Sequence, residues 1–336
     1  MGMRVITLGT AGGPQWWAGP ERGRRAGIAT AVEVDDAFYL VDAGLGAGRQ
    51  IMMAELELAR LHGVFLTHLH SDHVVDLPAI LLFGSVALTS LGRRIPIVGP
   101  GDRGMLPPVT PRAVTPPTPV APAQPTPGTT AMFRHLVEAY ATDINDRVLN
   151  ALRPSPEELF APSDIAIPDG IGYHPNENPY PDMSPFPVFE DERVRVTATL
   201  VAHAPLTPAF GFRFDSEHGS VTISGDTSPC DNVVRLAGGS DLLLHEAIDF
   251  DWVAARYHGH SAGFGAASVD HHRSAHSSVR EAISIAERAD VRTLAIHHLV
   301  PGAKAADEWR AAGAGSRPRF LVPDDLDVLD IGGKAQ

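Results

Sequence analysis

The segment Thr67-His68-Leu69-His70-Ser71-Asp72-His73 places three imidazoles and one carboxylate within six consecutive positions. The residues before it, Val64-Phe65-Leu66, are typical of a short buried strand, and the apolar run 74–83 after it favours a helix. Imidazole nitrogen and carboxylate oxygen are ligands that zinc prefers. Because a loop between a strand and a helix directs side chains to two sides, this segment could serve two metal ions about 3.5–4 Å apart.

The alternative interpretation of this segment is a histidine-rich surface loop. Further ligand-type residues follow at the ends of later predicted strands, which favours the metal site. A rigid sheet holds ligands at strand ends with small positional error. These later residues are His203, Asp226, Glu246, His276 and the pair His297-His298.

The composition of the 336-residue chain is that of a globular protein, with 44% apolar and 20% charged residues. A net charge of −13 and only two lysines argue against a general nucleic-acid binder, because clustered Lys and Arg bind phosphate backbones. Two dications would still attract an anionic substrate locally. We therefore expect a small-molecule partner, anionic or ester-type, ahead of nucleic acid, which the charge disfavours without excluding it.

The single cysteine, Cys230, rules out an internal disulfide and fits a reducing compartment. The sequence contains no run of about 20 apolar residues, so we expect no membrane span. Residues 1–6 lead directly into a predicted strand and leave no room for a signal peptide. We expect a cytoplasmic protein, although a chain that had lost a leader would look the same.

Apolar patterns predict strands in both halves of the chain, with helices near 49–61 and 277–289. This distribution suggests an α/β fold in which two mixed sheets are sandwiched between helical layers. The strands are expected at 3–9, 28–35, 37–42, 64–66, 95–100, 194–201, 210–214, 220–224, 242–245, 293–297 and 326–331.

Residues 101–190 differ in composition from the rest of the chain. Nine prolines lie between Gly101 and Thr130, and prolines are excluded from helix interiors and central strands. An amphipathic helix is predicted over 131–152, followed by a second Pro-rich tract. We interpret 101–190 as an insertion, a lid or dimer arm, within a single domain spanning 1–336. A disordered linker is the alternative.

The order of the motifs resembles the metallo-β-lactamase superfamily and, within it, the ribonuclease Z and arylsulfatase-like branch. The resemblance spans residues 3–301, leaves 101–190 unmatched, and implies the αββα sandwich fold and a metal-dependent hydrolase. The matching segments are Leu40 to Gly44, Thr67 to His73, His203, Gly211-Phe212-Arg213-Phe214, Ser224 to Thr227, His245-Glu246-Ala247, Ala275-His276-Ser277 and His298-Leu299-Val300-Pro301.

The resemblance also implies a binuclear metal site. One zinc would be held by His68, His70 and His203, and a second by Asp72, His73 and His298. Asp226 and a hydroxide would bridge the two ions. The hydroxide would attack phosphorus, a carbonyl or sulfur. Iron or manganese in place of zinc stays open.

The catalytic candidates are Asp72, His276 and Glu246. His276, oriented by Glu246, would donate a proton to the leaving group, as in the branch that the chain resembles. We expect the carboxylate to raise the pKa of the imidazole. A surface histidine and a strand-end glutamate that never touch are the alternative.

Three other positions carry weaker expectations. Only one of His297 and His298 should point into the site, since side chains alternate along a strand, and the family pattern favours His298. Asp42 is interpreted either as a residue that orients metal-binding imidazoles or as a plain turn former. Four further histidines are expected in loops, with substrate contact as the alternative: His258, His260, His271 and His272.

For function, we expect a dinuclear zinc hydrolase acting on a phosphodiester or ester-type bond of a small molecule. The alternatives are a tRNA 3′-end endonuclease, an arylsulfatase, lactonase or β-lactamase, or a non-catalytic metal-stabilised interaction protein. The chain departs from the ribonuclease Z pattern at Leu299-Val300-Pro301, where that branch has a Ser-rich, Arg-containing stretch. It also lacks a Gly-rich basic arm. A homodimer is left open.

Overall fold

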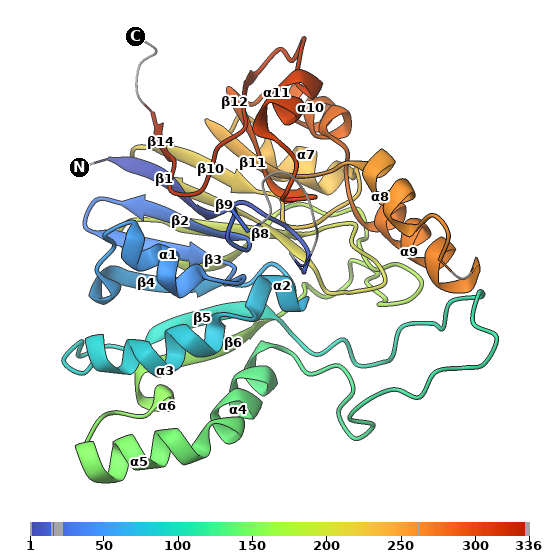
Figure 1. Cartoon of the computed structure of the whole chain (residues 1–336). Helices are drawn as coiled ribbons and strands as arrows, with labels where there is room; N and C mark the ends of the chain where they lie inside the picture. The colour runs from blue at the N-terminus through green and yellow to red at the C-terminus, as the bar shows by residue number, and fades with distance from the viewer. Residues whose placement is uncertain (1, 15, 17–22, 261, 333–336) are drawn as a thin grey trace.

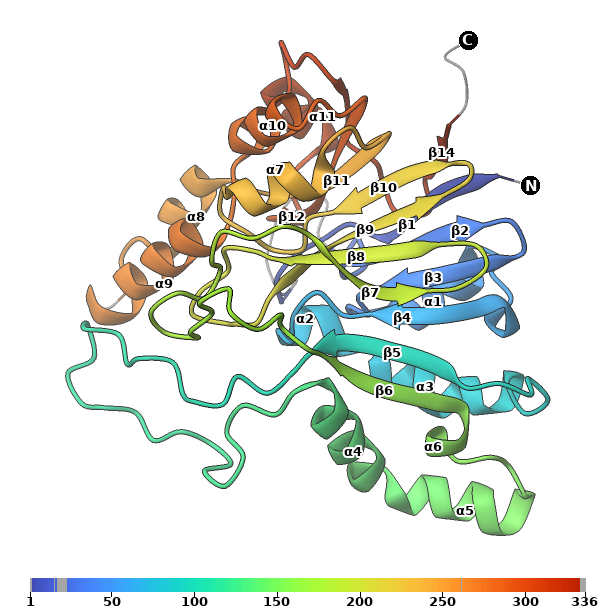
Figure 2. The same cartoon turned by 180° about the vertical axis from the view of Figure 1, so that it is seen from behind.

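The computed structural model describes residues 2–14, 16, 23–260 and 262–332. These residues form two seven-stranded mixed sheets that pack face to face, with helices on both outer faces (Figures 1 and 2). This αββα arrangement confirms the fold expected from the sequence.

The first sheet runs in the order β14-β1-β2-β3-β4-β5-β6. Antiparallel pairing joins β14 to β1, β1 to β2 and β2 to β3, whereas β3 to β6 run parallel. The strands are β1 (Met3–Gly9), β2 (Ala29–Val34), β3 (Ala37–Val41), β4 (Leu61–Phe65), β5 (Ile95–Pro100), β6 (Phe160–Ile165) and β14 (Val328–Ile331).

The second sheet runs in the order β13-β12-β11-β10-β9-β8-β7. Its strands β10 to β13 are parallel, and β7 to β10 are antiparallel. The strands are β7 (Phe186–Glu190), β8 (Arg195–Leu200), β9 (Phe210–Ser216), β10 (Gly219–Ile223), β11 (Leu242–Ile248), β12 (Thr293–Val300) and β13 (Arg319–Leu321).

The main core lies between the sheets. Phe65 of the first sheet meets Phe214 of the second with ring centroids 5.2 Å apart, in an edge-to-face arrangement. Outside the first sheet, buried residues of α1, α3 and α4 form a second apolar cluster, and α7 and α10 form a third outside the other sheet. The helices are α1 (Ala47–Met53), α2 (Ser71–Val74), α3 (Leu77–Ala87), α4 (Thr129–Ala139), α5 (Ala141–Ala151), α6 (Pro156–Leu159), α7 (Asp231–Ala237), α8 (Phe250–Tyr257), α9 (Ala262–Ala275), α10 (Val279–Arg288) and α11 (Ala306–Ala312).

The range 101–190 is less irregular than its composition suggests. Residues 101–128 form a long arm without helix or strand (Figure 1). Beyond the arm, the expected single helix is divided into α4 and α5 at Tyr140. Strand β6 then pairs with β5 along its whole length, and β7 joins the second sheet. The sequence Phe160-Ala-Pro-Ser-Asp-Ile165 hides this strand because Pro, Ser and Asp are rare in strands.

Among the described helices, none combines the length and the apolar character needed to cross a membrane.

Candidate metal centre

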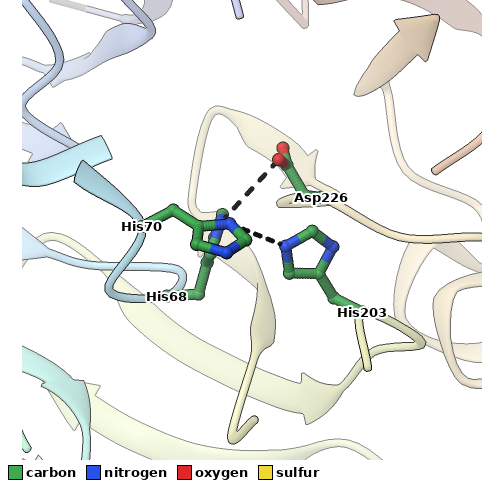
Figure 3. A group of neighbouring side chains, drawn as sticks. All are labelled: His68, His70, His203 and Asp226. Carbon is green, nitrogen blue, oxygen red and sulfur yellow. Dashed lines mark hydrogen bonds and ion pairs between the residues drawn. The ribbon is translucent and has the colours of Figure 1, made fainter. Parts of the chain in front are cut away.

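Three imidazoles and one carboxylate converge where β4, β8 and β10 end (Figure 3). The Nδ1 atom of His70 lies 3.1 Å from Nε2 of His68 and 3.1 Å from Nε2 of His203. Oδ2 of Asp226 is 3.8 Å from Nε2 of His68. Two nitrogens bound to one tetrahedral zinc lie about 3.3 Å apart, so this spacing is suited to a single ion.

A second group lies directly beside the first and shares Asp226 with it. Nε2 of His298 is 3.3 Å from Oδ2 of Asp72 and 3.3 Å from Oδ2 of Asp226. Nε2 of His73 also lies 3.3 Å from Oδ2 of Asp226 and 3.8 Å from Oδ2 of Asp72. The Asp226 carboxylate therefore stands between the two groups, as a bridging ligand would.

Fixed hydrogen bonds orient the imidazoles. Oδ2 of Asp42 lies 2.8 Å from Nδ1 of His73 and accepts a 2.8 Å bond from the Thr67 hydroxyl. Nδ1 of His203 lies 2.9 Å from the carbonyl of Ala275. Because Nδ1 of His73 and of His203 is engaged in this way, Nε2 of each ring faces the candidate metal centre. Of the two interpretations that the sequence allows for Asp42, these contacts favour a residue that orients a metal-binding imidazole.

His298 reaches the centre through a bulge in β12. Glu246 pairs with His297 but Ala247 pairs with Leu299, so His298 is the extra residue, with a φ of 46°. A bulge redirects one side chain, and here it turns His298 into the centre. His297 is buried but belongs to none of the candidate ligand groups among the described residues.

The buried polar atoms of the centre are those of a cation site. Among the described residues, Oδ1 of Asp226 and Nε2 of His73 are buried and make no hydrogen bond. Such atoms cost free energy unless a partner such as a metal satisfies them. Burial also lowers the pKa of the His68 and His203 imidazoles well below the usual value and keeps them in the neutral form that binds metals. The residues present therefore fit a metal pair.

Glu246 and His276 touch, as the sequence predicts. Oε1 of Glu246 lies 3.0 Å from Nδ1 of His276, and both side chains are buried. The expectation that the carboxylate raises the pKa of the imidazole is wrong for this structure. Burial dominates and lowers the pKa of His276 to about 4, while it raises the pKa of Glu246 well above its ordinary value.

Comparison with known proteins agrees with this geometry. Residues 22–134 match the model of the metallo-beta-lactamase superfamily. The chain is 30% identical over 311 residues to a protein named ribonuclease Z from Mycobacterium bovis, a match that covers 91% of this chain and 92% of that protein. The chain belongs to the metallo-β-lactamase superfamily, in its ribonuclease Z branch.

Solved structures show the same fold. Human tRNase Z, short form, superposes with a TM-score of 0.61 at 19% identity, covering 98% of this chain and 99% of that one. The metallo-beta-lactamase fold protein YhfI from Bacillus subtilis gives a TM-score of 0.61 at 17% identity, with 98% and 100% covered. Membership of the superfamily makes the chain a metal-dependent hydrolase.

Two features of this centre were not predicted from the sequence. His271 and His272 lie on helix α9 and not in a loop, and the His271 ring is 6.2 Å from the rings of His70 and His276. Gly12 lies under His298, so that a Cβ atom there would fall 2.3 Å from the ring. The Gly12-Gly13 pair after the first strand could have indicated this contact, because glycine is favoured where the backbone approaches another group closely.

Proposed function

We propose that this chain is a ribonuclease Z-type phosphodiesterase that uses two zinc ions to remove 3′ extensions from precursor tRNA in the cytoplasm. One observation carries the chemistry: six ligand-type side chains from distant parts of the sequence, four of them buried, meet around the buried Asp226. The match to ribonuclease Z over nine-tenths of both chains supports the substrate.

The proposed roles follow from the contacts. His68, His70 and His203 would hold one ion, and Asp72, His73 and His298 the other, on either side of Asp226. When bound, such an ion pair acidifies water and neutralises charge on a phosphate. Glu246 lies against Nδ1 of His276, so Nε2 is the nitrogen left to exchange a proton. Because burial lowers the pKa of this ring to about 4, Nε2 would take up a proton during the reaction before passing it to the leaving oxygen.

The relatives favour tRNA over the small-molecule substrate that the sequence predicts first. The net charge of −13 remains an unusual feature for a protein that acts on RNA. A second candidate, hydrolysis of a small phosphodiester or ester, is supported by a separate observation: an apolar cavity opens beside His70.

The test uses the zinc-loaded protein and a precursor tRNA with a 3′ extension. We expect the extension to be released, the reaction to stop with 1,10-phenanthroline, and added zinc to restore it. His203→Ala should abolish cleavage, whereas His135→Ala, a half-exposed histidine on α4, should not. An intact precursor after incubation with zinc-loaded protein would overturn the tRNA proposal. Zinc-dependent turnover of bis(p-nitrophenyl) phosphate by the same sample would then favour the second candidate.

A further inference from the structure

A cavity of about 560 Å³ adjoins the metal centre, between the irregular arm 101–128 and two loops of the sandwich. Leu69 and His70 contribute from the metal-binding loop, and residues 205–208 contribute from the loop that follows His203. The arm and α4 complete the wall with Leu106, Val120 and Met132. The site-facing end of the cavity is therefore His70 itself, a member of the first ligand group.

The wall of the cavity is mostly carbon. Seven of its seventeen residues are prolines, and leucine, valine and methionine side chains add to them. A surface that binds an RNA backbone needs several cations, whereas this wall holds one, Arg103. Apolar pockets of this size, with a few polar groups, are typical of small-molecule sites.

Arg103 places a positive charge in the cavity wall. Its side chain is almost fully buried, with 8% of the residue exposed. The Nη1 atom donates to the carbonyl of Met105 at 2.7 Å, and Nη2 donates to Oδ1 of Asn176 at 2.7 Å and to the carbonyl of Pro175 at 3.0 Å. Among the described residues, its buried Nε has no hydrogen-bond partner. Because Nε is buried, a ligand in the cavity would meet Arg103 through the positive charge of its guanidinium rather than through this donor.

We propose that this cavity binds an alkyl or aryl group of a small phosphodiester whose scissile bond lies at the metal centre, with the positive charge of Arg103 attracting the anionic phosphate. The inference rests on the metal-dependent hydrolysis proposed above and develops its second candidate, a small phosphodiester. In hydrolysis of hexyl p-nitrophenyl phosphate, the oxygen of water bonds to phosphorus and the bond to p-nitrophenolate breaks. The products are hexyl phosphate, p-nitrophenolate and protons released to solvent.

The kinetic test compares methyl and hexyl p-nitrophenyl phosphate, which share a leaving group, on the zinc-loaded enzyme. Burial of five additional methylenes should raise kcat/KM for the hexyl compound at least about tenfold over the methyl compound. Leu106→Trp and Leu206→Trp, which fill the cavity from two segments, should reduce this ratio to near one. The matched control is Leu149→Trp on exposed α5, which should keep the ratio. A ratio near one in the unmodified enzyme, or an unchanged ratio in both cavity variants, overturns the proposal.

A binding test separates the cavity from the chemistry. The fluorescence of 8-anilinonaphthalene-1-sulfonate should rise on binding to the zinc-loaded protein and fall when hexyl phosphate, but not methyl phosphate, displaces it. Leu106→Trp should weaken this binding, and Leu149→Trp should not. Absence of displacement by hexyl phosphate overturns the cavity proposal. If displacement occurs but neither ester is hydrolysed, the cavity proposal stands and the proposed hydrolysis of small phosphodiesters fails.

Discussion

The imidazole of His276 is held by Glu246 across a buried contact of 3.0 Å between Nδ1 and Oε1. The same Oε1 atom accepts a 2.8 Å hydrogen bond from the backbone of Thr227, next to Asp226. The orientation of His276 is therefore tied to the backbone that carries the shared carboxylate. A side chain fixed in this way is suited to hold a proton at one defined position.

The first prediction concerns His276. Replacing it with alanine removes the proposed proton donor, which matters most when the leaving group is a poor one. We expect kcat to fall about 10²–10³-fold on a phosphodiester with an alkoxide leaving group, and far less on bis(p-nitrophenyl) phosphate. The measurement is kcat on both substrates for His276→Ala and for His135→Ala as the control. Equal losses on both substrates would rule out the acid role.

The second prediction concerns Asp42, which holds His73 by a 2.8 Å contact to Nδ1. In Asp42→Asn, the amide keeps the shape but loses the charge that supports the imidazole. We expect zinc affinity at the proposed second position, formed by Asp72, His73 and His298, to fall about 10–100-fold, as for other residues that orient metal ligands. Competition with a fluorescent zinc chelator measures this affinity. The control is Asp164→Asn, which should leave zinc affinity unchanged. The Asp164 carboxylate accepts a hydrogen bond from the backbone N–H of Thr130.

The third prediction tests the close approach of Gly12 to His298. A Cβ atom at position 12 would lie 2.3 to 2.6 Å from three atoms of the imidazole, so Gly12→Ala must displace the ring. We expect zinc content per chain, measured by elemental analysis, to drop from two ions toward one. Gly2→Ala is the matched control, because nothing lies within 4 Å of a Cβ atom there. Two ions retained in Gly12→Ala would show that His298 is not needed for zinc binding.

The sequence predicts most of this architecture because the informative patterns are local. Strand β4, the ligand loop after it and the helix that follows are contiguous, and their chemistry is visible in seven residues. His203 and Asp226 each come shortly after an apolar strand, a position that the sheet itself enforces, whereas His276 directly follows helix α9. Convergence of these strand ends follows from the fold, which the order of motifs indicates.

The features that escaped prediction depend on tertiary contacts. The bulge that turns His298 inward arises from the register shift between β11 and β12, and register cannot be read from one strand. The low pKa of His276 comes from burial, which outweighs the charges of Asp226 and Asp72, and the extent of burial is not visible in the sequence. Strand β6 has a weak strand composition and forms because β5 offers an open edge.

The last prediction asks whether β6 belongs to the core or to a dispensable insertion. Phe160 at the start of β6 is fully buried in the apolar cluster outside the first sheet. Phe160→Ala should lower the free energy of unfolding by about 3–5 kcal/mol, the usual cost of removing a buried aromatic ring. Phe83→Ala is the control, since Phe83 is 67% exposed on α3 and should change stability by less than about 1 kcal/mol. Urea unfolding followed by circular dichroism provides both values. A cost for Phe160→Ala as small as that of the control would show that 160–165 can separate from the sheet, and that the sandwich is stable without its edge strand.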